Sequence, residues 1–162
     1  MPYRVYAEQG YCFPCGNKTI DYDQIEQFIV DLVEDYQLEV ASIAFDKTFA
    51  DEMMKNLAER VYQEEPSVDV RQGAHNLGAT VVEIQRAILE ERFKYAPNPL
   101  MRAAFFNGVI VMKTGRPWVD KMDKKKTKID SLVATFNAVK MAMYFREENL
   151  FVDESYSPLL EM

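Results

Sequence analysis

Apolar residues recur at helical spacing in several long stretches of this chain. The clearest pattern, at positions 25, 28, 29, 32, 33 and 36, predicts a helix over Asp21–Tyr36. Similar spacing predicts helices over Phe49–Val61, Leu77–Phe93 and Ile129–Phe145, and a shorter one over Leu100–Phe106.

Three segments have the pattern of strands. Val40–Asp46 is a nearly unbroken apolar run, which is typical of a strand buried on both faces in a parallel sheet. Ser67–Arg71 alternates, and Gly108–Lys113 leads through a turn at Gly115–Pro117 toward a hairpin partner at Trp118 and Val119. Helices and strands in this order predict an α/β fold with a partly parallel, mixed sheet flanked by helices. Residues 1–20 contain no apolar run that could supply a central strand, so the sheet is expected to be incomplete on the N-terminal side.

Polar residues just before the helices suggest how they begin. Thr127-Lys128-Ile129-Asp130 fits a capping box, in which a threonine oxygen and an acidic side chain satisfy free N–H groups of the first turn. Asp23 with Glu26, and Thr48 with Asp51, fit similar patterns. Capping alone would explain Asp130.

Charge is spread unevenly along the 162 residues, whose length suits one domain with a real core. The formal net charge is −7, which argues against a general nucleic-acid coat protein, yet residues 113–128 carry +5 and the remainder −12. Such a patch fits either a solvated loop or a site that meets phosphates at one place. The candidate DNA-binding residues are Lys113, Arg116, Lys121, Lys124, Lys125, Lys126 and Lys128. No apolar run approaches the length of a membrane span, and the N-terminus shows no secretory signal.

Two carboxylates are candidates for catalysis. Asp46 stands at the carboxyl end of the predicted buried strand, the edge at which open α/β sheets bind ligands, and Asp130 stands at another helix start. A parallel layout can bring both junctions to one edge. Carboxylates suit hard divalent cations, so these two, joined by a third, could hold two Mg²⁺ or Mn²⁺ ions for phosphodiester cleavage. The alternative for Asp46 is a loop residue that only helps to start the next helix.

Other reactive residues make weaker sites. Cys12 and Cys15 form a CxxC, which could be redox-active or half of a zinc site, but no helix follows directly and no second CxxC exists. His75 is the only histidine and has no obvious nucleophile partner. The chain has no G-x-x-x-x-G-K-[ST] phosphate loop, which excludes ATP binding by that route.

Five segments in order resemble the nuclease part of the large terminase subunits of tailed bacteriophages. They are PYRVYAEQGYCFPCGNKTIDYDQI, IAFDKTFADEMMKNL, VRQGAHNLGATVVEIQRAI, NPLMRAAFFNGVIV and DKKKTKIDSLVATFNAVKMA. The resemblance covers residues 2–145, so residues 1–145 are expected to form a terminase-type nuclease domain followed by an acidic tail over residues 146–162. It implies a ribonuclease H-like fold, and Asn98, Asn107 and Lys121 match recurring positions of the family.

The resemblance also implies an activity and partners. It maps Asp46 and Asp130 to two of three metal-binding acidic residues of an endonuclease that uses Mg²⁺ or Mn²⁺ to cut concatemeric double-stranded DNA during packaging. The first catalytic aspartate of the family lies on a strand upstream of Met1, so weak or absent activity is expected of this chain by itself. The expected partners are double-stranded DNA, the ATPase domain or another upstream polypeptide, the small subunit and the portal protein, in the host cytoplasm. The alternative is a non-enzymatic module that clamps DNA or assembles the motor.

Overall fold

The computed structural model describes residues 2–61 and 67–147. Helices dominate it: α1 (Tyr3–Glu8), α2 (Tyr22–Asp35), α3 (Lys47–Arg60), α4 (Ala74–Leu89), α5 (Pro99–Asn107) and α6 (Asp130–Glu147). The strands are β1 (Ala44–Phe45), β2 (Val68–Asp69), β3 (Gly108–Lys113) and β4 (Arg116–Lys121). Every helix predicted from periodicity is present, with its ends shifted by a few residues. None of the helices described is long and apolar enough to cross a membrane.

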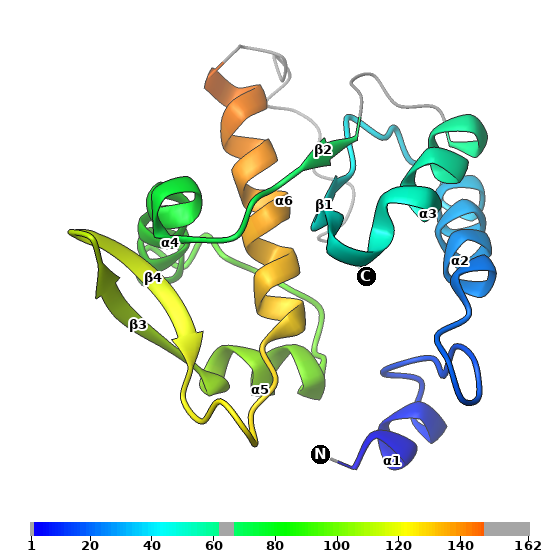
Figure 1. The fold of residues 1–162 in the computed structure, drawn as a ribbon, viewed down its shortest axis with the longest axis horizontal. Coiled ribbons are helices and arrows are strands. Elements are labelled where there is room, and N and C mark those ends of the chain that lie inside the picture. The colour runs from blue at the N-terminus through cyan, green and yellow to red at the C-terminus, as the bar shows by residue number, and fades with distance from the viewer. Residues whose placement is uncertain (1, 62–66, 148–162) are drawn as a thin grey trace.

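The four strands form two small sheets (Figure 1). β1 and β2 pair in parallel, with Ala44 opposite Val68, whereas β3 and β4 form an antiparallel hairpin. The expected parallel pairing is therefore confirmed, but the described residues do not join the two pairs into one mixed sheet. Of the predicted strand Val40–Asp46, only Ala44–Phe45 form a regular strand. These two residues pair with the two residues of β2.

The hairpin turns through Thr114 and Gly115, at φ 51° and 75°. Two successive residues with positive φ are the signature of the tight turn whose twist suits a two-residue hairpin. The turn thus lies one residue earlier than the predicted Gly115–Pro117, and β4 begins at Arg116.

Two hydrophobic clusters form the core. The first lies among α4, the hairpin and α6, and its most buried side chains are Leu77, Val70 and Val81. The second lies between α2 and α3 around Leu57, which is 0% exposed. Figure 1 shows the corresponding halves on either side of the β1–β2 pair, with α6 running along the first half.

Strand β1 joins the two clusters. Ile43 and Phe45 pack against the α2–α3 cluster, whereas Ala44 packs against the cluster that contains Leu132 and Phe136 of α6. Alternate residues of a strand point to opposite faces, so this short strand serves both cores at once. The residue that follows it, Asp46, is held at the junction of the two halves.

Candidate metal and nucleic-acid site

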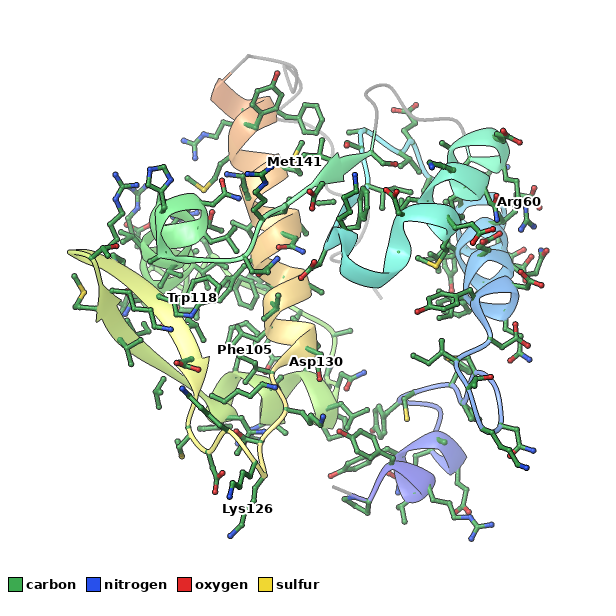
Figure 2. All side chains as sticks on the ribbon, in the orientation of Figure 1. Arg60, Phe105, Trp118, Lys126, Asp130 and Met141 are labelled. Atoms are coloured by element: carbon green, nitrogen blue, oxygen red, sulfur yellow. The ribbon has the colours of Figure 1, made fainter. Side chains whose placement is uncertain are left out.

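Asp46 and Asp130 lie on elements that pack together. Asp46 is exposed directly after β1 and before α3. Asp130 is the first residue of α6. This helix contacts β1, and its Leu132 and Phe136 belong to the cluster against which Ala44 packs. Both residues therefore stand at element ends, as predicted, and Figure 2 shows Asp130 at the start of α6.

Asp69 is a second carboxylate at the end of the β1–β2 pair that Asp46 follows, and the sequence analysis missed it. Asp69 is the last residue of β2 and lies opposite Phe45, the residue directly before Asp46. Its Oδ1 accepts a hydrogen bond of 3.3 Å from the backbone N–H of Lys47, the first residue of α3. Asp69 thus contacts the start of α3 from another strand, and Thr48, which was predicted to stand before this helix, is its second residue. The sequence signal for Asp69 was its place in the alternating segment Ser67–Arg71, where it is the middle residue and lies on the face opposite Val68 and Val70.

The start of α6 differs from the predicted capping box. Thr127 lies three residues before Asp130, and its hydroxyl is used within the preceding turn: it donates to the carbonyl of Asp123 (2.7 Å) and accepts from the N–H of Asp123 (3.2 Å). Asp130 is instead the first residue of the helix, where a negative charge is stabilised by the helix dipole. The predicted cap at Asp23 and Glu26 is also wrong, because Asp21 caps α2 by accepting from the N–H of Gln24.

Residues 122–128, named here the lysine loop, hold three consecutive exposed lysines before α6. The carboxylate of Asp123 accepts from the N–H groups of Lys125 (2.9 Å) and Lys126 (3.2 Å), which fixes the turn. Asn107 closes the loop at both ends: its carbonyl accepts from the N–H of Met122, and its side-chain amide donates to the carbonyl of Lys128. The backbone of the loop is therefore held in place, while Lys124, Lys125 and Lys126 are exposed to solvent; Figure 2 shows Lys126 at the tip of the loop, away from Asp130.

The hairpin divides the predicted basic segment into two groups. In its register Lys113 pairs with Arg116 at the turn, and Gly108 pairs with Lys121 at the opposite end, next to the lysine loop. A six-residue strand is roughly 17–20 Å long. Arg116 is therefore well separated from Lys121 and the lysine loop, although the sequence presents all of them as one stretch.

Asp120 partly neutralises the middle of the hairpin. Its carboxylate lies 3.3 Å from the ammonium of Lys113 and 4.0 Å from that of Lys124. The backbone N–H of Lys121, which donates to it, and then the Lys113 ammonium lower the pKa of Asp120 below its usual range. Lys113 also lies over the ring of Trp118, 5.9 Å from the centroid. Of the seven predicted DNA-binding residues, Lys113 is thus the one most engaged within the protein.

The chemistry of the donors fits a hard divalent cation, since Asp46 and Asp130 offer carboxylate oxygens. Among residues 2–61 and 67–147, however, no three histidine, cysteine or acidic residues are grouped so that they could hold a metal ion. Asp46 and Asp130 are two carboxylates on elements that contact each other. Their roles remain predictions.

Comparison with known proteins identifies the family. Residues 3–146 match the family described as "Terminase large subunit, endonuclease domain". The chain belongs to this family.

One relative and one solved structure agree with this assignment. The large terminase subunit of Enterobacteria phage HK97 is 27% identical over 143 residues, which are 87% of this chain and 27% of that protein. The crystal structure of the HK97 bacteriophage large terminase matches with a TM-score of 0.72 at 24% identity, over 86% of this chain and 29% of that one. The fold is therefore that of a terminase segment, and the chain spans little more than a quarter of the relative.

Two positions that the resemblance marked receive structural roles. Asn98 caps α5, accepting from the N–H groups of Leu100 and Met101, and its amide donates to the carbonyl of Tyr11. Asn107 closes the lysine loop, as described above. These contacts tie the N-terminal segment to α5 and α5 to the lysine loop, so both asparagines position other elements.

The other reactive residues stay outside this site. Cys12 and Cys15 are free and partly exposed, and the Cys12 thiol donates to the carbonyl of Tyr3. His75 is exposed in the first turn of α4. The family match ends at residue 146, α6 extends to Glu147, and the predicted acidic tail beyond it lies outside the described residues.

Proposed function

We propose that this terminase domain contributes Asp46 and Asp130 to a metal-dependent centre that cuts double-stranded DNA during genome packaging. The observation that carries the proposal is the packing of β1 against α6 in a chain of the endonuclease-domain family, which joins the elements bearing both carboxylates. The β1–β2 pair would then be part of a ribonuclease H-like sheet. The lysine loop, adjacent to Asp130, would bind the phosphates of the substrate.

Each group has a defined task in this proposal. Bound Mg²⁺ or Mn²⁺ would activate water and stabilise the leaving oxygen of the phosphodiester. Asp46 would hold its ion from the end of β1, and Asp130 from the start of α6. The proposed partners are the ATPase part of the large subunit, the small subunit and the portal protein, in the host cytoplasm.

Metal binding can be tested without relying on cleavage. Mn²⁺ added to the full chain should broaden the amide NMR signals of residues 45–47 and 130–132 together, because a paramagnetic ion held by both carboxylates lies close to both segments. Asp46→Asn and Asp130→Asn should each abolish the broadening at both segments. The matched control is Asp35→Asn at the exposed end of α2, which should leave it unchanged. Broadening at only one segment, or unchanged broadening in either site variant, would rule out a shared site.

Cleavage is the second readout. Plasmid nicking with Mn²⁺, measured with the chain alone and with the upstream part of a large terminase supplied, should be lost in Asp46→Ala and in Asp130→Ala. Nicking that persists in both variants would remove these residues from the catalytic centre.

The second candidate is a module that clamps DNA without cutting it. It is favoured by the ordered lysine loop together with the lack of a three-ligand metal group among the described residues. Under this alternative, DNA affinity should fall steeply with salt, should be weakened by Lys124→Ala/Lys125→Ala/Lys126→Ala, and should be indifferent to Mn²⁺. Stronger binding in the presence of Mn²⁺ that depends on Asp46 and Asp130 would instead favour the first proposal.

A further inference from the structure

A second basic surface lies at the turn end of the hairpin, away from the lysine loop. It consists of Arg71, which precedes α4, Arg116 at the start of β4, and Lys140 on α6. These residues are far apart in the sequence, and only Arg116 belongs to the basic segment. The surface is therefore assembled by the fold.

The first turn of α4 contacts Arg116 and Lys140 through their side chains and Arg71 through its backbone. The guanidinium of Arg116 donates to the carbonyl of His75 (3.0 Å). The backbone of Gly78 is also close to Arg116: a Cβ atom added to Gly78 would lie 3.4 Å from the Cβ of Arg116. The ammonium of Lys140 donates to the backbone carbonyl (3.1 Å) and the side-chain oxygen (3.0 Å) of Asn76. Arg71 lies five residues before Asn76, and its carbonyl accepts from the Asn76 amide (2.7 Å).

The positive charge of this surface is not cancelled by carboxylates. Within residues 2–61 and 67–147, none of its three cations forms an ion pair with an acidic side chain, and the oxygens that hold Arg116 and Lys140 are neutral. The other end of α4 differs, because Arg86 and Arg92 are paired with acidic residues there.

The hydrogen bonds also orient the cations while leaving donors unused. A guanidinium carries five N–H donors and an ammonium three. Arg116 uses one at His75, and Lys140 gives two bonds to Asn76, so both retain donors for an anion. Lys140 is half-buried, and a half-buried charge without a counterion is stabilised by an arriving anion.

We propose that Arg71, Arg116 and Lys140 form a second phosphate-binding surface that contacts the backbone of the same DNA duplex as the lysine loop. The hairpin separates the two surfaces by roughly 17–20 Å. Half a helical turn of B-DNA is about 17 Å, from a repeat of ~34 Å, so one duplex laid along the hairpin can reach both. The inference rests on the proposed DNA-binding function and adds to it a second point of contact that fixes the direction of the duplex.

The test is the salt dependence of binding to a 20-base-pair duplex by the full chain, measured by fluorescence anisotropy. Each phosphate contact contributes about one to the slope of log K against log salt. The triple variant Arg71→Gln/Arg116→Gln/Lys140→Gln should lower the slope by about two to three and should weaken binding at least tenfold at ~0.1 M salt. Arg71→Gln alone should lower the slope by about one. The Arg71 side chain is exposed and makes no hydrogen bond that the fold needs.

The matched control removes the same charge from elsewhere. Arg86→Gln/Arg92→Gln/Lys94→Gln takes three positive charges from the far end of α4 and the segment after it, and its slope should stay within about one of the wild-type value. Equal losses in both triple variants would mean that only net charge matters and would overturn the inference. A normal slope in the Arg71, Arg116 and Lys140 triple variant, together with a reduced slope in the lysine-loop variant, would overturn the second surface and leave the proposed function standing. A wild-type chain that binds no DNA would fail the proposed function itself.

Discussion

The halves on either side of β1 have opposite charge. Residues 2–61, named here the acidic half, carry 12 acidic and 5 basic residues, whereas residues 67–147, the basic half, carry 8 acidic and 14 basic residues. Each half has its own hydrophobic cluster, and β1 and β2 join them. The net charge of −7 and the single lysine-rich segment make the chain look acidic with one basic loop. The fold shows instead that the excess of positive charge belongs to an entire half of the molecule.

The halves also differ in how they bury polar groups. In the acidic half, Glu26 is 5% exposed and is held by the amide of Asn56 at 3.1 Å and the guanidinium of Arg60 at 3.6 Å. In the basic half the buried polar residues, Thr80 and Asn137, are neutral, and Asn137 accepts from Gln72, whose amide also donates to the carbonyl of Val70. The acidic half therefore buries a charged residue in an ion pair, whereas the buried polar residues of the basic half are uncharged.

The largest expected effect tests whether the halves fold together. Leu57→Ala in the acidic half and Leu77→Ala in the basic half each empty a site that is 0% exposed, and each should cost about 2–5 kcal/mol of unfolding free energy. Trp118, the single tryptophan, reports on the basic half. If β1 couples the halves, urea transitions followed by Trp118 fluorescence and by circular dichroism should coincide in both variants. A Trp118 transition that ignores Leu57→Ala would show two independent units.

The buried ion pair gives the next largest effect. Glu26→Gln should lower the unfolding free energy by about 1.5–3 kcal/mol, because a buried charge-assisted hydrogen bond is replaced beside Arg60 by an uncharged amide. Asp31→Asn, on the exposed side of the same helix, is the control and should stay within about 0.5 kcal/mol of the wild type in urea denaturation. Equal effects of the two changes would contradict the ion-pair role of Glu26.

A smaller effect is expected where Asn107 closes the lysine loop. Asn107→Ala removes the bond to the carbonyl of Lys128 and should cost about 1 kcal/mol. The same variant should weaken DNA binding without changing the number of lysines, because the loop is less ordered. Unchanged DNA affinity would show that the order of the loop is not needed for binding.

The smallest effect concerns pH. The lowered pKa of Asp120 means that its ionised carboxylate stabilises the folded state above the unfolded pKa of about 3.9, and that this stabilisation is lost as the pH falls through the folded pKa. Asp120→Asn should therefore lower the urea midpoint slightly at pH 7, and the difference from the wild type should shrink steadily below about pH 4. A difference that grows on acidification would have the wrong sign.

Much of this arrangement could be predicted from the sequence, and the failures have physical causes. Helix periodicity located every long helix, because each buries one apolar face. Helix starts were less predictable: Thr127 fits a cap by spacing, but its hydroxyl is used by Asp123, three residues before the helix begins. The role of Asp69 depends on a contact with Lys47, 22 residues away, which no local pattern contains.

The basic surfaces show the same limit. Residues 113–128 look like one patch in sequence, yet the hairpin places Arg116 a strand's length from Lys121. Arg71 and Lys140 carry no motif and join Arg116 only through the first turn of α4. Asp46 and Asp130 were identifiable as candidates because each stands at an element boundary, and the packing of β1 on α6 is what relates them.

The central claim, that the basic half binds DNA and the acidic half meets it only at Asp46, can be tested most directly by hydrogen–deuterium exchange of the full chain with and without a 20-base-pair duplex. The account predicts slower exchange in the lysine loop, in the hairpin and in residues 71–76, with no change over α2. Protection of α2 and α3, with the lysine loop and residues 71–76 unchanged, would contradict it.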